Sequence, residues 1–282
     1  LMMILRFLIG FAVGIASFVV PLYLSETAPA KIRGSMGTLF QLMITIGIFL
    51  ISLTNVFIAR LVSTPQNALP MMFGVIVLFA LLMFIGSIFL PESPRWLMLK
   101  GRKYAATKIL EKVMSTREDV DTEVGEIEKT LAEGSGSAKT VFKKYFIKIL
   151  LVGIGLQMFQ QLVGINVMIY YAPKIFGFAG MTGIIAMMTV PTVNMLFTVP
   201  AVRLVEKWGR KKLLYVGASI MLMTMLSAGI AFSIIGLHAQ HDMTSVSMGI
   251  KAVLLISVIA YIFGFAVSWG PVAWIICSEI FP

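Results

Sequence analysis

The sequence has little charge. Only 13% of its 282 residues are Asp, Glu, Lys or Arg, whereas an average soluble domain has roughly 25%. Hydrophobic residues make up 59% of the chain, and its mean hydropathy is +0.94. The scarcity of charge therefore excludes an ordinary soluble domain. Runs of about 20 apolar residues recur along the chain, and each is long enough to cross a bilayer.

Seven such runs are predicted membrane helices, at about residues 1–24, 35–59, 69–90, 147–172, 181–205, 212–236 and 252–277. They divide the chain into a first membrane part (1–90), an insert (91–146) and a second membrane part (147–282). Within the insert, two polar stretches at about 101–114 and 118–132 are predicted helices, and GSGSA at 134–138 is a predicted flexible joint. The chain starts inside an apolar run without an initiator Met, and we interpret it as a fragment.

Cysteine is nearly absent, and chemically reactive motifs are missing. The single Cys277 excludes an internal disulfide. The sequence has no nucleophile–base set, Walker loop or metal-ligand cluster, so it predicts neither an enzyme, nor a metal site, nor an ATP-driven pump. The acidic run from Glu118 to Glu128 is interpreted as a solvated helix face rather than a cation site.

The positive charges are concentrated in three segments. The net charge is +10, and of 23 Lys and Arg residues two lie in 25–34, twelve in 91–148 and five in 203–212. In membrane proteins, successive loops lie on opposite sides of the membrane, and the cytoplasmic loops carry an excess of Lys and Arg. The three segments are therefore predicted to be cytoplasmic, and the charge orients the chain in the membrane rather than binding nucleic acid.

One membrane run is unusually polar. Residues 157–173 read QMFQQLVGINVMIYYAP, and a polar side chain in hydrocarbon is costly unless it faces protein or a water-filled cavity. Gln157, Gln160 and Gly164 share one helical face, and Gln161 borders it. Gly164 offers a place for the helix to break and turn Asn166 inward, because interrupted helices line transporter sites near mid-membrane.

A second interruption is predicted in FGFAVSWGPVAW, residues 263–274. Pro271 removes an amide hydrogen, and Gly270 allows a bend. Amides together with the indoles of Trp269 and Trp274 would line a polar, uncharged cavity that suits a polyhydroxylated neutral solute. The alternative is that these amides only join helices to one another, as is common in membrane bundles.

QQLVGINVMIYYAP resembles the seventh-helix signature of the sugar porter branch of the major facilitator superfamily. So do PLYLSETAPAKIRG (21–34), PESPRW (91–96), RLVEKWGRKK (203–212) and SWGPVAWIICSEIFP (268–282). The resemblance implies an all-α membrane protein with twelve helices in two halves, joined by an intracellular helical insert. In that register the chain covers about helices 4–10 of 12 plus the insert.

The resemblance also implies roles for particular residues. Hexose contacts would come from Gln41, Gln160, Gln161, Asn166, Asn194 and Trp274. Helix hinges would lie at Gly164, Gly270 and Pro271. An intracellular gate of salt bridges would be formed by Glu26, Arg33, Glu92, Arg95, Glu206, Arg210 and Glu279. Arg6 matches an arginine that tunes an acid on the first helix of proton-coupled relatives.

The implied function is transport of a monosaccharide, a hexose such as glucose or galactose, by alternating access, either as a proton symporter or as a uniporter. Ile48 favours a hexose, because some xylose carriers have an amide at the matching position. The alternatives are a polyol or pentose carrier and a sugar sensor that does not transport. The implied partners are a small neutral sugar and the lipid bilayer, with no nucleic acid, obligate protein partner or cofactor beyond a proton gradient. The implied place is the plasma membrane, with a bacterial inner membrane favoured.

Overall fold

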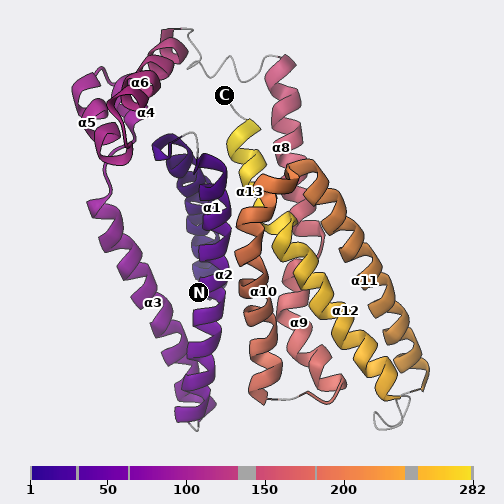
Figure 1. Cartoon of the computed structure of the whole chain (residues 1–282). Coiled ribbons are helices and arrows are strands. Elements are labelled where there is room, and N and C mark those ends of the chain that lie inside the picture. The colour runs from indigo at the N-terminus through magenta and orange to yellow at the C-terminus, as the bar shows by residue number, and fades with distance from the viewer. Residues whose placement is uncertain are drawn as a thin grey trace. The chain divides into compact units, whose positions relative to one another are not determined.

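The computed structural model describes residues 2–29, 32–62, 64–132, 144–181, 183–238 and 247–280. Within these ranges the helices are joined by short turns and loops, and no strand is present (Figure 1). Seven helical stretches are long and apolar enough to cross a membrane: Met3–Thr27, Ser35–Leu61, Gln66–Phe89, Ile147–Gly177, Gly183–Trp208, Arg210–Gly236 and Met248–Cys277. The seven predicted spans are therefore confirmed, with boundaries that differ by a few residues.

Five of these stretches are single helices, namely α1 (Met2–Thr27), α2 (Arg33–Leu61), α3 (Pro65–Phe89), α10 (Gly183–Trp208) and α11 (Arg210–His238). Prolines inside α1, α3 and α10 do not end these helices. The last stretch begins earlier than its composition predicts, and Lys251 lies inside it. The reason is a cap, because the Ser247 side chain accepts a hydrogen bond from the Gly249 amide at 3.3 Å and starts the helix there.

Two of the seven stretches are broken. One consists of α8 (Lys144–Leu162) and α9 (Ile165–Phe178), joined through Gly164 at φ +90°. The other consists of α12 (Met248–Val267) and α13 (Trp269–Ile280), joined at Ser268 with φ −131° and ψ −86°. This second break therefore precedes Gly270 and Pro271, which lie in the first turn of α13.

The insert forms a small three-helix cluster of α4 (Pro94–Leu99), α5 (Lys103–Val113) and α6 (Arg117–Ala132) (Figure 1). The two predicted helices are present, and α4 is an addition. Its start follows from the PESPRW segment, in which Ser93 caps the helix and Pro94 occupies its first turn. The cluster has its own core of Leu97, Met98, Ala106, Leu110, Val120, Val124 and Ile127. The predicted joint at 134–138 lies outside the described residues.

The acidic run on α6 is a solvated face with one exception. Glu118, Asp119, Asp121, Glu126 and Glu128 are exposed, as the sequence predicts. Glu123, however, is only 7% exposed. It lies three and four residues from the core positions Val120 and Ile127, so helical periodicity turns it toward the inner face of the cluster.

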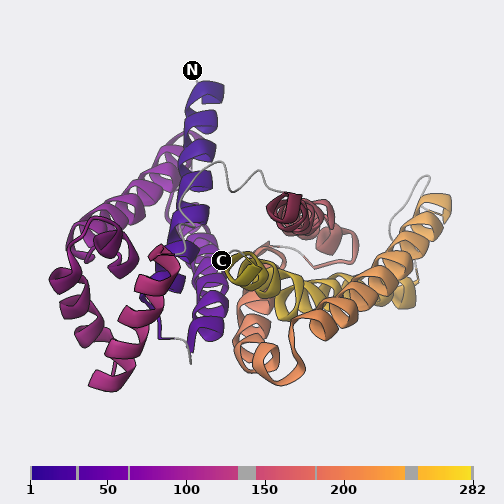
Figure 2. The same ribbon diagram turned by 90° about the horizontal axis from the view of Figure 1, so that it is seen from above.

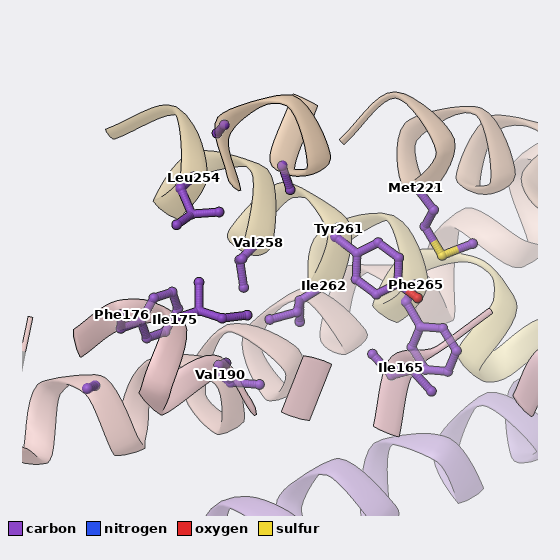
Figure 3. Close-up of a cluster of buried hydrophobic side chains, with 14 of the residues drawn as sticks. Ile165, Ile175, Phe176, Val190, Met221, Leu254, Val258, Tyr261, Ile262 and Phe265 are labelled. Atoms are coloured by element: carbon purple, nitrogen blue, oxygen red, sulfur yellow. The ribbon is translucent and has the colours of Figure 1, made fainter. Parts of the chain in front are cut away.

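Packing divides the chain into two compact units. The first comprises Leu1–Gly37, Ser87–Gly155 and Trp274–Pro282, and the second Thr38–Gly86 and Leu156–Ala273. The predicted division at residues 90 and 146 rests on membrane topology rather than packing, and it stays a prediction. In the second unit, α11 and α12 run side by side (Figure 2), and α9, α10 and α12 share a buried core (Figure 3).

Candidate functional site

Gln160 connects the two broken stretches. It lies near the end of α8 and is 3% exposed. Its side-chain Nε2 donates to the carbonyl oxygens of Trp269 at 3.3 Å and Gly270 at 3.4 Å. Both acceptors belong to the first turn of α13, immediately after the break at Ser268. The donor of this buried amide is thus satisfied by backbone at the second break.

Two further amides extend this contact into a chain. Gln161 Nε2 donates to Gln160 Oε1 at 3.3 Å, and Asn166 Nδ2 donates to Gln161 Oε1 at 2.9 Å. We call Gln160, Gln161 and Asn166 the amide chain. Its first member is buried and its other two members are exposed. The chain therefore leads from the second helix break to an accessible face of the second unit.

The break at Gly164 makes the last link of the amide chain possible. On a continuous helix, side chains five residues apart point about 140° away from each other. Gln161 and Asn166 are five residues apart and still form a hydrogen bond, because the left-handed conformation of Gly164 redirects α9. Glycine adopts this conformation without the penalty that a Cβ atom brings.

Gln41 approaches the same region from α2. It is 6% exposed. A Cβ atom at Gly270 would lie 3.3 Å from Gln41 Nε2 and 3.2 Å from the Phe265 carbonyl oxygen. Any side chain at position 270 would therefore crowd Gln41. Three elements, α2, α8 and α13, thus bring predicted site residues together around Gly270.

Two aromatic residues bond to the backbone near the breaks: Tyr261, which was not among the predicted site residues, and Trp269, whose indole was predicted to line the cavity. Tyr261 on α12 is 1% exposed, and its hydroxyl donates to the Val163 carbonyl oxygen at 2.7 Å. The indole Nε1 of Trp269 donates to the Leu214 carbonyl oxygen on α11 at 3.2 Å. The sequence signal for Tyr261 is weak, because its hydroxyl is one of three in an otherwise apolar run, together with those of Ser257 and Ser268.

Three more predicted residues lie on α10 and α13. Asn194 is 3% exposed in the middle of α10, and its side-chain oxygen has no hydrogen-bond partner within the described ranges. Trp274 is half-buried on α13 and belongs to the first compact unit. Pro271 is buried in the first turn of α13. The structure thus places Asn194 in the middle of α10 and Pro271 and Trp274 in the first two turns of α13.

Glu26, one of the predicted gate residues, lies where α1 meets the start of the insert in the first unit. The Ser93 hydroxyl donates to a carboxylate oxygen of Glu26, and the Tyr23 hydroxyl donates to the Pro91 carbonyl oxygen at 2.9 Å. These bonds attach the end of α1 to the start of the insert. Arg95 has a buried Nε atom that meets no acceptor in the described part of the chain.

The other predicted gate residues are distributed along the chain. Glu92 is exposed, Glu206 and Glu279 are exposed near the ends of α10 and α13, and Arg210 opens α11. Arg33 starts α2, and its side chain lies outside the described residues. Salt bridges among these residues therefore stay a prediction. Arg6 is exposed on α1.

The site is uncharged where the helices break. In the described ranges, no group of three or more His, Cys, Asp or Glu could hold a metal ion. The amide chain and the carbonyls beside it supply only neutral donors and acceptors. Neutral donors and acceptors suit a neutral hydroxylated ligand better than an ion.

Comparison with known proteins identifies the family. The family model described as sugar (and other) transporter matches residues 1–282, the whole chain. The chain belongs to this family. The resemblance identified from the motifs is therefore confirmed.

Among curated relatives, the galactose–proton symporter of Escherichia coli K12 is 40% identical over 98% of this chain and 58% of its own length. The D-xylose–proton symporter of the same strain is 38% identical over 99% of this chain and 55% of its own length. A metabolite transport protein of Bacillus subtilis, YwtG, is 38% identical over 100% of this chain and 59% of its own length. The chain thus spans less than two thirds of the length of the relatives it matches.

A solved structure of the proton:xylose symporter XylE, bound to 6-bromo-6-deoxy-D-glucose, superposes with a TM-score of 0.81 at 36% identity. The match covers 97% of this chain and 56% of that protein. The fold is therefore that of the major facilitator superfamily, as the sequence predicts. With seven membrane-spanning stretches and bacterial relatives of this family, the chain is part of a multi-pass protein of the bacterial inner membrane.

Proposed function

We propose that the protein carries a monosaccharide across the membrane by alternating access, with a hexose as the preferred substrate. The observation that supports this most directly is the amide chain, in which three uncharged side chains meet beside two helix breaks. Each amide offers a donor and an acceptor close together, which matches neighbouring hydroxyl groups of a sugar. The chain belongs to a family of transporters rather than enzymes, which supports transport of the sugar without chemical change.

In the proposed binding step, sugar hydroxyls replace the bonds that the amides make with one another. Gln161 and Asn166 are exposed and bonded mainly to other amides, so exchanging those bonds for bonds to a sugar costs little. Gln160 is different, because its donor is occupied by backbone carbonyls of α13. A sugar that draws on Gln160 would also loosen the second break.

The proposed site extends beyond the amide chain. Gln41 is included because of its closeness to Gly270. Asn194 is included because its buried oxygen lacks a donor within the described ranges, which a sugar hydroxyl would supply. Trp274 is included for its half-buried indole, which can cover the apolar face of a sugar ring.

Alternating access is proposed to use the two breaks as hinges, at Gly164 and beside Gly270 and Pro271. Residues 1–90 and 147–282 would contribute to the two membrane halves that rock about the sugar, with 91–146 as the cytoplasmic connection. The gate residues would close the cytoplasmic side through a network of weak ion pairs. Exposed pairs contribute about 0–1 kcal/mol each, and several together bias two states that differ by a few kcal/mol.

A pentose is the second candidate substrate. Relatives named as xylose and arabinose symporters of E. coli are 38% and 37% identical to this chain. Against it, the apolar side chain of Ile48 offers no hydrogen-bonding group on the α2 face that carries Gln41. The relatives that are proton symporters also support coupling to a proton gradient, with Arg6 as a candidate residue for that coupling.

Counterflow uptake by the full-length protein in liposomes tests the proposal. Labelled glucose would be challenged with galactose, xylose and inositol, with and without a proton gradient. Saturable exchange that galactose competes more strongly than xylose supports a hexose carrier, and gradient-driven accumulation supports symport. Sugar binding without any flux would instead indicate a sensor.

A matched pair of variants tests the site. Gln161→Ala removes an exposed member of the amide chain, whereas Gln66→Ala removes an exposed amide from α3 far from it in sequence. We expect Gln161→Ala to weaken glucose affinity about tenfold and Gln66→Ala to leave it unchanged. Equal effects of the two variants would refute the assignment.

A further inference from the structure

Tyr261 lies at the first helix break although it belongs to a different helix. Its ring packs in the buried core with Ile165 and Phe265 (Figure 3). Its hydroxyl reaches the carbonyl oxygen of Val163 at 2.7 Å. Val163 lies between the end of α8 at Leu162 and the start of α9 at Ile165. The bond therefore reaches the short segment that joins the two helices.

The bond has a counterpart at the other break. Gln160, on α8, donates to two carbonyls in the first turn of α13. Tyr261, on α12, donates to the carbonyl at the break between α8 and α9. Each broken stretch thus supplies a side-chain donor to the backbone at the break of the other. A movement at one break must strain or release a hydrogen bond at the other.

The Val163 carbonyl needs this donor. Burying a carbonyl without a hydrogen-bond partner is costly in a membrane, where water does not replace the lost bond. The hydroxyl also fixes the orientation of the peptide plane between Val163 and Gly164. That orientation sets the direction in which α9 leaves the glycine, and hence whether Asn166 reaches Gln161 at 2.9 Å.

We propose that Tyr261 is a positioning residue for sugar binding: its hydroxyl holds the break between α8 and α9 in the shape that presents Gln161 and Asn166 to the sugar. The tyrosine itself does not touch the sugar. That the ligand is a sugar rests on the proposed function. The effect on the backbone at the break is independent of that function.

The test compares two hydroxyl deletions on α12. Tyr261→Phe keeps the ring in the core and removes the hydroxyl alone. Ser257→Ala is the matched control: Ser257 is 4% exposed, lies one turn earlier on the same helix, and its hydroxyl is 2.7 Å from that of Ser227 on α11. Both variants remove a buried hydroxyl, but only the first removes a bond to the break.

Two quantities are measured on the full-length protein in detergent. The first is amide hydrogen exchange across residues 164–168 without sugar, and the second is the affinity for D-glucose. For Tyr261→Phe we expect exchange in this segment to rise about five- to tenfold, the effect of losing one hydrogen bond. Glucose affinity should fall by a similar factor. Ser257→Ala should leave both the amide exchange at 164–168 and the glucose affinity unchanged.

Unchanged exchange at 164–168 in Tyr261→Phe would overturn the inference, as would equal changes in both variants. Faster exchange with unaltered glucose affinity would also overturn it, because the break would then open without affecting the sugar. If the unaltered protein binds none of the sugars tested, the proposed function fails. The exchange measurement still shows in that case whether Tyr261 holds the break.

Discussion

The break at Gly164 can be tested by a substitution whose cost comes from backbone conformation alone. Gly164 has φ +90°, and a Cβ atom there would meet nothing within 4 Å. Gly164→Ala therefore creates no clash. An L-residue in the left-handed region costs about 1–2 kcal/mol, so the broken conformation should become about 5–30-fold less populated.

Gly155, nine residues earlier on α8, is the matched control. It is also free of contacts at the Cβ position, but it has ordinary helical backbone angles. Replacing a glycine inside a helix by alanine stabilises the helix by roughly 0.5–1 kcal/mol. The two Gly→Ala variants should therefore change stability in opposite directions, with a gap of about 1.5–3 kcal/mol between them.

The assay is thermal unfolding of the full-length protein in detergent, together with glucose binding. Gly164→Ala should lower the unfolding midpoint and weaken glucose binding, because Asn166 is turned away from Gln161. Gly155→Ala should raise the midpoint and leave glucose binding unchanged. Parallel shifts in the two variants would show that the left-handed glycine does not shape the site.

Three further predictions concern other contacts. Gln160→Leu should lower the free energy of unfolding by about 1–2 kcal/mol and so lower the unfolding midpoint. Gln161→Leu should weaken glucose binding with little change in the midpoint. The reverse pattern would exclude Gln160 as a link between the breaks. Ser93→Ala removes a helix cap worth about 0.5–2 kcal/mol, so amide exchange in α4 should increase, and unchanged exchange would argue against the cap. Leu110→Ala in the insert core should cost about 2–5 kcal/mol and expose the insert to protease. Lys103→Ala removes the exposed ion pair between Lys103 on α5 and Glu128 on α6 and should cost under about 1 kcal/mol. Comparable protease sensitivity of the two variants would contradict the existence of an independent core.

Much of the fold follows from local composition. The spans were located by runs of apolar residues, and the basic segments between them predict which loops are cytoplasmic. The predicted start of the last span, at about residue 252, was too late. The Ser247 side chain caps α12 and starts the helix early enough to place Lys251 inside it. Glu123 was expected to be solvated, but helical periodicity turns it toward the core of the insert.

The site was predictable in its chemistry and only partly in its geometry. Amides beside a glycine indicate a broken, polar membrane helix. They do not say that the Gln160 side-chain nitrogen donates to the backbone of α13. Nor does any local pattern distinguish Tyr261 from a tyrosine that merely fills the core.

By itself, the sequence determined the number of spans and the glycine at which the α8–α9 stretch breaks, and it predicts how the spans are oriented in the membrane. Each of these depends on residues within about one helix length, where apolar content, charge and backbone freedom decide the outcome. Only the tertiary structure decided which groups meet at the breaks. The bonds from Gln160 to Trp269 and from Tyr261 to Val163 join residues 109 and 98 positions apart. Such pairs depend on how whole helices pack, because a buried carbonyl accepts whichever donor the packing brings to it.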